Sequence, residues 1–191
     1  CEHLEGLDAK TIHQVVDTAL EGGVNILDVF MSEPNVRRDI GLALKGRRDK
    51  VLIQGHFGAR WKDGQYGRTR ERKETQFFFE DLLHRLDTDY IDIGMFHCVD
   101  TDREFDQIFS GGTADYAQKL KQQGTVRTIG ISTHDPHIGL RAIESGIVDV
   151  ILFSINPAYD LLPDGLGSTA PLFDPVTYQQ PLLGMHPLRA R

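Results

Sequence analysis

Segments with helical periodicity alternate with short strands rich in valine and isoleucine along most of this chain. The periodicity predicts helices at 10–21, 34–45, 74–86, 113–123 and 135–145. The apolar runs between them predict strands at 24–29, 50–56, 90–96, 126–132 and 148–156. A helix that joins two strands returns the chain in the same direction, so we expect these strands to pair in parallel. The predicted fold class is α/β.

Two parallel architectures fit this alternation, a closed (β/α) barrel and an open doubly wound sheet. No G-x-G-x-x-G motif follows a strand, so the nucleotide-binding open sheet lacks its main support. Residues 57–70, rich in glycine and arginine, are predicted to form a loop. Prolines punctuate the chain from residue 157 onward. We therefore expect one folded unit over 1–163 and an irregular tail over 164–191, with a candidate short strand at 181–188.

The overall composition limits the partners that this chain can bind. A length of 191 residues with 40% hydrophobic content allows one sizeable core. The formal net charge of -7 argues against nonspecific nucleic-acid binding, which needs a basic face. No apolar run approaches the ~18 residues of a membrane span, and no signal peptide pattern opens the chain. We expect a cytoplasmic protein that binds a small-molecule substrate, with no nucleic-acid or membrane partner and with its oligomeric state left open.

The cysteines and the first residue carry two further expectations. Cys1 and Cys98 are far apart and form no C-x-x-C pair. The sequence therefore predicts no disulfide framework, no thiolate zinc site and no iron–sulfur cluster. The chain begins at Cys1 without an initiator methionine, so we expect a fragment or an incomplete reading frame.

Polar side chains stand where the predicted strands end. The residues at these exits are Asp28, His56, His97, Ser132 and Asn156. A lone histidine after an apolar run is usually a core residue that a backbone carbonyl satisfies. In a parallel barrel, however, all strands end at the same mouth, where the chemistry is found. Five polar exits in one chain therefore favour a functional mouth.

Five segments carry a resemblance to a known family: "GGVNILDV", "RRDKVLIQGH", "LHRLDTDYIDIGMFHCVD", "QQGTVRTIGIS" and "SGIVDVILFSIN". In their order and spacing they resemble the aldo/keto reductase superfamily over about residues 10–163. The chain looks most similar to a bacterial branch of predicted oxidoreductases that often carries an iron–sulfur segment after the barrel. The resemblance implies a TIM-type (β/α)8 barrel, incomplete here, with about five to six strands present over 1–163.

The resemblance also implies a chemistry for the barrel mouth. Members of the family reduce carbonyls with NADPH, using an Asp, a Tyr, a Lys and a His. The Tyr donates the proton, the Lys paired with the Asp lowers the Tyr pKa, and the His orients the carbonyl oxygen. Asp28 and His97 match the family's Asp and His. A count from Asp28 without gaps places Glu33 at the Tyr position, and His56 ends the strand that should carry the Lys.

The implied cofactor is NADP or NAD, and the expected contacts to it are Ser132, Thr133 and Asn156. Ser132 fits the family's serine beside the nicotinamide amide, whereas Thr133 stands where asparagine is commoner. The first hypothesis is therefore an NAD(P)-dependent oxidoreductase with an altered catalytic tetrad.

The missing tyrosine leaves the proton donor of such an enzyme open. His56 or His97 could donate in its place, and so could Glu33 if burial kept it protonated. Tyr66 or Tyr159, from a loop, could also supply the hydroxyl.

Two alternatives to this enzyme use the same residues. Asp28, Glu33, His56 and His97 form an acceptable ligand set for Zn, Mn or Fe, although no H-x-H or H-E-x-x-H spacing supports a metal enzyme. The other alternative is a catalytically inactive or truncated relative with a binding or scaffold role. We favour the oxidoreductase and expect no metal ligand among these residues.

Overall fold

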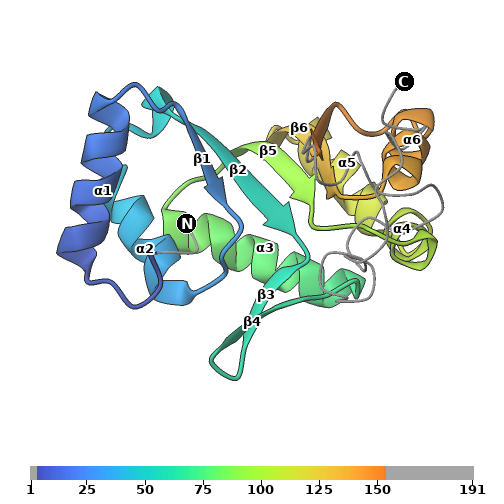
Figure 1. Ribbon diagram of the computed structural model, residues 1–191, viewed down its shortest axis with the longest axis horizontal. Coiled ribbons are helices and arrows are strands. Elements are labelled where there is room, and N and C mark those ends of the chain that lie inside the picture. The colour runs from blue at the N-terminus through green and yellow to red at the C-terminus, as the bar shows by residue number, and fades with distance from the viewer. Residues whose placement is uncertain (1–3, 154–191) are drawn as a thin grey trace, which may run out of the picture.

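The computed structural model describes residues 4–153, which form a twisted parallel sheet with helices on its outer face (Figure 1). Five strands form the sheet in the order β1-β2-β5-β6-β7, and every neighbouring pair is parallel. Their bounds are β1 Ile26–Val29, β2 Leu52–Phe57, β5 Ile91–Phe96, β6 Val126–Thr133 and β7 Val150–Phe153. The predicted α/β class and the parallel pairing are confirmed.

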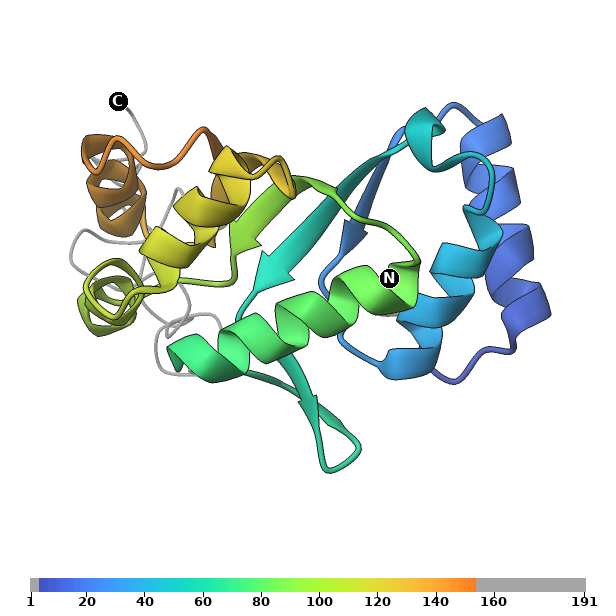
Figure 2. The same ribbon diagram turned by 180° about the vertical axis from the view of Figure 1, so that it is seen from behind.

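The helices between the strands are close to those that the periodicity predicts. They are α1 Ala9–Glu21, α2 Pro34–Ala43, α3 Arg72–Leu86, α4 Asp102–Phe109, α5 Thr113–Gln122 and α6 Pro136–Glu144, with a short 3-10 turn at Arg48–Lys50. Helix α3 crosses behind the strands in Figure 1 and in front of them in Figure 2. Its buried face carries Phe79, Leu82 and Leu86, and the Phe79 ring stacks on Phe57 of β2 at 4.2 Å between centroids. This contact fixes the helix against the centre of the sheet.

The β3–β4 hairpin and helix α4 were not predicted from the sequence. Residues 57–70, expected to be a loop, contain an antiparallel hairpin of β3 Ala59–Lys62 and β4 Gln65–Arg68. The hairpin turns at Asp63 and Gly64, which both have positive φ, as a two-residue type I′ turn requires. It projects away from the sheet beyond the end of β2 in both views (Figures 1 and 2). The second element is α4, which Thr101 caps by accepting a hydrogen bond from the Glu104 backbone N–H.

A buried carboxylate, Asp92 of β5, ties three strands together near the amino ends of the sheet. Its Oδ2 accepts hydrogen bonds from the Ile53 backbone N–H of β2 at 2.9 Å and from Arg48 at 2.8 Å. Its Oδ1 accepts a hydrogen bond from Arg127 of β6 at 2.7 Å. Asp92 is 4% exposed, so its charge depends on these donors for the solvation that water would otherwise give.

Two helical glycines offer a matched test of packing. A Cβ at Gly41 of α2 would lie 2.8 Å from backbone atoms of Arg85 and Leu86, whereas one at Gly139 of α6 would meet only Thr133 Cγ2 at 3.9 Å. Alanine favours a helix over glycine by about 1 kcal/mol at either site. We expect Gly139→Ala to raise the free energy of unfolding by about 0.5–1 kcal/mol, and Gly41→Ala to lower it by about 1–3 kcal/mol through overpacking. Urea unfolding of both variants checks this, and equal shifts would contradict the close helix contact.

Several sequence predictions lie outside the described residues. These are Asn156, Tyr159, the tail at 164–191 and its candidate strand at 181–188. Within residues 4–153, no helix has the length and the apolar character needed to cross a membrane.

Candidate functional site

Three of the predicted mouth residues meet at the carboxyl ends of neighbouring strands. Asp28 lies on β1, His56 on β2, and His97 directly follows β5. His56 Nε2 lies 2.7 Å from Asp28 Oδ1, and His56 Nδ1 lies 2.8 Å from His97 Nδ1. The two imidazole rings are nearly perpendicular, at 87° and 4.7 Å between centroids. Parallel pairing of β1 with β2 and of β2 with β5 brings together residues that are far apart in sequence.

A fourth side chain reaches this group from the hairpin. The Tyr66 hydroxyl of β4 forms a short hydrogen bond with His97 Nε2. Four side chains therefore form a continuous hydrogen-bonded chain, which runs from Asp28 through His56 and His97 to Tyr66. The Phe30 ring lies 6.0 Å from the rings of both His97 and Tyr66, and so adds an apolar wall to the chain.

Two members of this hydrogen-bonded chain, His97 and Asp28, differ in charge. Burial lowers the pKa of His97 to about 3, and the nearby cations His56, Arg70 and Arg68 lower it in the same direction. His97 is therefore a neutral imidazole at neutral pH. Burial raises the pKa of Asp28, but the hydrogen bond and the charge of His56 outweigh burial and leave this pKa below its usual value. Asp28 is thus a carboxylate, and its side chain is 42% exposed.

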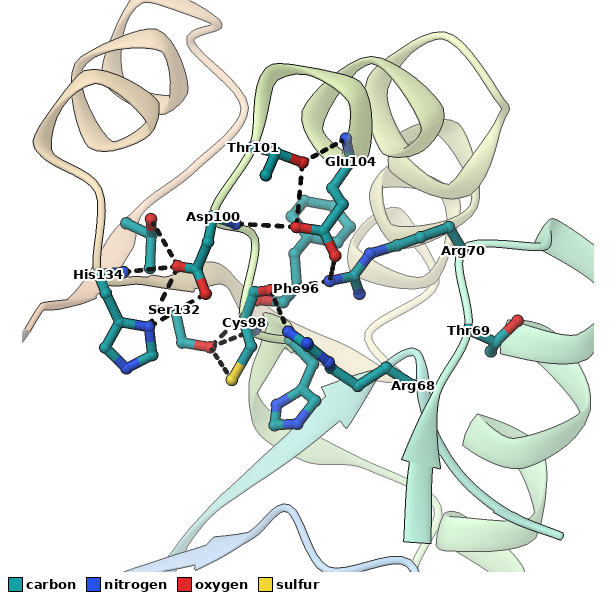
Figure 3. Close-up of polar contacts among 12 residues, drawn as sticks. Arg68, Thr69, Arg70, Phe96, Cys98, Asp100, Thr101, Glu104, Ser132 and His134 are labelled. Carbon is teal, nitrogen blue, oxygen red and sulfur yellow. Dashed lines mark hydrogen bonds and ion pairs between the residues drawn. The ribbon is translucent and has the colours of Figure 1, made fainter. Parts of the chain in front are cut away.

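The backbone turn after His97 is held in an unusual conformation. Cys98 has a φ of 47°, which is uncommon for a residue with a side chain. Its N–H donates to Ser132 Oγ at 2.7 Å, and its carbonyl accepts from Arg68 at 3.0 Å and from Arg70 at 2.8 Å (Figure 3). These contacts come from β6, from β4 and from the residues before α3. They hold the turn that orients the His97 ring toward His56.

Two of the three predicted cofactor contacts, Ser132 and Thr133, lie at the end of β6. The Ser132 hydroxyl accepts from Cys98 N–H, and the acceptors nearest to its own hydrogen are distant, Phe96 O at 3.5 Å and Cys98 Sγ at 4.0 Å. This hydroxyl can therefore still donate to a ligand. Thr133 has a structural contact as well, because its hydroxyl accepts from the Asp135 N–H at 3.0 Å at the start of α6.

The structure does not bring Glu33 to this group. Its carboxylate accepts from the Val36 N–H at 2.7 Å and caps α2. The gapless count that placed it at the family's Tyr position ignored this local signal, a glutamate directly before the proline that opens a helix. Among residues 4–153, no group of three or more His, Cys, Asp or Glu side chains is placed to hold a metal ion. The metal alternative therefore loses its proposed ligand set.

A cavity of about 430 Å³ opens at this mouth, a size within the usual range for small-molecule sites. Its walls include all four members of the hydrogen-bonded chain and both β6 residues. The lining residues are Asp28, Phe30, His56, Tyr66, His97, Cys98, Ser132, Thr133, His134, Leu152 and Phe153. The four hydrogen-bonded side chains therefore line the same cavity as apolar residues such as Phe30 and Leu152.

Tyr66 was named from the sequence only as one of several replacements for the proton donor. The signal that would have singled it out is Asp63-Gly64, a strong two-residue hairpin turn. This turn pairs Trp61 with Tyr66. A hairpin predicted at this turn would have placed Tyr66 back near the carboxyl end of β2.

Comparisons with known proteins match this chain over most of its length. The model of the family described as "Aldo/keto reductase family" matches residues 3–162. Aldo-keto reductase YhdN of Bacillus subtilis is 28% identical over 160 residues, which cover 82% of this chain and 46% of that protein. L-galactose dehydrogenase of Arabidopsis thaliana is 36% identical over 132 residues, which cover 63% of this chain and 39% of that protein.

A solved structure shows the same arrangement. The holo form of aldo-keto reductase AKR11C1 from Bacillus halodurans matches with a TM-score of 0.68 and 27% identity, over 83% of this chain and 52% of that chain. The chain therefore spans about half the length of the relatives that it matches. The match confirms the predicted (β/α) barrel fold, of which the described strands form one side.

Proposed function

Since this chain belongs to the aldo/keto reductase family, we propose that it is part of an NAD(P)-dependent oxidoreductase that interconverts a carbonyl group and an alcohol. One observation carries the proposal. The Tyr66 hydroxyl, the His97 ring and the Asp28–His56 pair line the same cavity as Ser132 at the carboxyl ends of the strands. A proton-transfer group and a hydroxyl able to donate to a ligand then face the same small molecule.

In this proposal Tyr66 exchanges a proton with the substrate oxygen. It takes the role of the family's tyrosine, at whose position the count from Asp28 placed Glu33. Its hydroxyl lies on the hairpin, outside the five-stranded sheet, and forms one end of the hydrogen-bonded chain. His97 holds this hydroxyl in place and lines the cavity beside it. His56 stands where the family has its lysine and, like that lysine, pairs with the aspartate. The substrate is a small molecule, because the cavity holds about 430 Å³.

The residues at the end of β6 fit the nicotinamide end of the cofactor. A carboxamide needs both donors and acceptors, and the Ser132 hydroxyl offers a donor whose present acceptors are at 3.5 Å or more. The bound nicotinamide would supply or accept the hydride. Ser132 and Thr133 would orient its amide, and Phe30 with Leu152 would keep water from the reacting face.

A binding and turnover assay tests this function. We expect the purified protein to quench NADPH or NADH fluorescence on binding and to turn over one of a panel of aldehydes, ketones and alcohols. A Ser132→Ala variant should bind the cofactor more weakly and keep its fold, as judged by circular dichroism. If the wild-type protein neither binds a nicotinamide nucleotide nor turns over any member of the panel, the proposal is wrong and the non-catalytic alternative is favoured.

A further inference from the structure

Two arginines donate hydrogen bonds to the same carbonyl oxygen beside the cavity. Arg68 Nη1 lies 3.0 Å from the Cys98 oxygen, and Arg70 Nη2 lies 2.8 Å from it. In Figure 3 both side chains reach Cys98 from the same side. Guanidinium groups are always charged in proteins, and like charges at this separation repel each other. A negative charge nearby would therefore stabilise the pair.

The two arginines differ in what compensates their charge. The Arg70 side chain is 10% exposed, and it pairs with Glu104 at 2.8 Å. Arg68 is exposed, and among residues 4–153 its side chain contacts only the Cys98 carbonyl and lies in no ion pair. Most of its N–H donors therefore have no acceptor among these residues. Because Arg70 also holds the Cys98 carbonyl, the turn keeps a hydrogen bond there without Arg68.

The hairpin places Arg68 on the side of the ribbon that faces the mouth. Tyr66 and Arg68 are two residues apart on β4, so their side chains share a face. Tyr66 contacts His97. Arg68 contacts the next residue, Cys98. Both contacted residues line the cavity, so the Arg68 guanidinium lies at the rim of this cavity.

The charge of Arg68 also acts on a wall of the cavity. The pKa of His97 is lowered to about 3, first by burial and then by the charges of His56, Arg70 and Arg68. A positive charge that disfavours the cationic form of this ring favours an anion in the same place. The cavity beside His97 is therefore suited to a negatively charged group.

The carboxylates around the mouth leave this place open to an anion. Asp28 is the one carboxylate among the described lining residues, and it is bonded to His56 on β2. It lies on β1, two strands away from the Cys98 turn. Asp100 accepts from the His134 N–H at 2.8 Å and lies on the other side of Cys98 in Figure 3. A ligand anion would thus lie toward Arg68 and away from Asp28.

We propose that Arg68 binds an oxyanion on the substrate and is the specificity-determining residue of this mouth. The inference rests on the proposed function for the reaction and deepens it by naming the substrate class. The substrate is a small carbonyl compound or alcohol that also carries a carboxylate or a phosphate. The fork of N–H donors on a guanidinium matches two oxygens of either group.

Binding can be measured without cofactor or turnover, by 1H–15N NMR of the backbone amides. We expect cyclohexanecarboxylate to shift the signals of Cys98 and Ser132 and to bind with a Kd about tenfold lower than cyclohexanecarboxamide, which has the same shape without the charge. Cyclohexyl phosphate is the second anion, and the tighter of the two identifies the group. Equal affinities for anions and amide, no binding of either anion, or shifts confined to other regions would overturn the inference.

Two hairpin cations provide matched variants. Arg68→Gln should bring the ratio of the two Kd values close to one, and Arg68→Lys, which keeps the charge but not the fork, should give an intermediate ratio. Lys62→Gln removes one charge from the opposite face of the same ribbon and should keep the wild-type ratio. An unchanged Cys98 amide signal in the free variants shows that the turn is intact. Equal losses in Arg68→Gln and Lys62→Gln would show that the general charge of the hairpin, and not Arg68, attracts the anion.

Turnover separates this inference from the proposed function. Arg68→Gln should lower kcat/KM for 4-carboxybenzaldehyde by about tenfold and leave kcat/KM for 4-carbamoylbenzaldehyde nearly unchanged. Preference for the anion in the NMR titration without any nicotinamide-linked turnover would reject the function and keep the Arg68 site. Turnover of both aldehydes with equal losses, or with no loss, in Arg68→Gln would keep the function and reject this inference.

Discussion

Replacing Tyr66 by phenylalanine is expected to lower kcat for nicotinamide-linked turnover by about 10²–10⁴-fold, the usual contribution of a positioned acid or base. The substitution keeps the ring and removes only the hydroxyl, which ends the hydrogen-bonded chain at His97 Nε2. Because the hydroxyl acts on the substrate oxygen in the proposed reaction, the Kd for the nicotinamide nucleotide should change little. Steady-state kinetics and fluorescence titration of the same preparation measure both quantities.

Tyr90→Phe is the matched control for this loss. Tyr90 precedes β5, at the end of the strand away from the mouth, and its ring lies between the guanidinium groups of Arg48 and Arg127 at 4.1 and 4.2 Å. The same hydroxyl deletion there should leave kcat within about twofold, since surface changes away from special features are small. If Tyr66→Phe kept the wild-type kcat, the assignment of Tyr66 as the proton donor would be wrong.

The second large effect is expected at Asp92. Substitution by alanine should lower the free energy of unfolding by about 3–5 kcal/mol, the range seen when one partner of a buried ion pair is removed. The loss would leave the 16% exposed Arg48 side chain without its carboxylate and the Ile53 N–H without its acceptor. Arg127 contributes less, because its side chain is 57% exposed and water can solvate it.

Guanidinium unfolding of Asp92→Ala, Asp92→Asn and the exposed control Asp89→Ala measures this effect. Asparagine still offers one oxygen to the donors, so we expect an intermediate loss for it. Asp89→Ala should shift the free energy of unfolding by no more than about 0.5 kcal/mol. A loss at Asp92→Ala below about 1 kcal/mol would mean that water replaces the carboxylate and that the three-strand contact contributes little.

The sequence predicted the parallel sheet well because its signals are local. Apolar runs that end in a polar residue correctly predicted Asp28, His56 and His97 at the carboxyl ends of neighbouring strands. Their mutual contacts could not be predicted, because the facing of His56 Nδ1 and His97 Nδ1 depends on side-chain rotamers and on the Cys98 turn. That turn is held by residues from β4 and β6, and such tertiary constraints leave no periodic trace in the sequence.

The errors in the site also have local causes. Glu33 was assigned by counting along the chain, while the helix cap that occupies its carboxylate follows from the adjacent Pro34. The hairpin was taken for a loop because its strands are only four residues long, too short for an alternating pattern to stand out. The hydroxyl that we propose as the proton donor therefore lies in the segment that was predicted to be a loop.

The position of the Tyr66 hydroxyl beside His97 depends on the pairing of the two hairpin strands. Successive side chains of β4 point to opposite faces, so the two-residue turn at Asp63 and Gly64 places the Tyr66 hydroxyl on the His97 side. A shift of one residue in the pairing of β3 with β4 would move the phenol to the other face of the ribbon. In the proposed reaction this shift would separate the phenol from His97 and from the substrate, although the five strands of the sheet would keep their pairing.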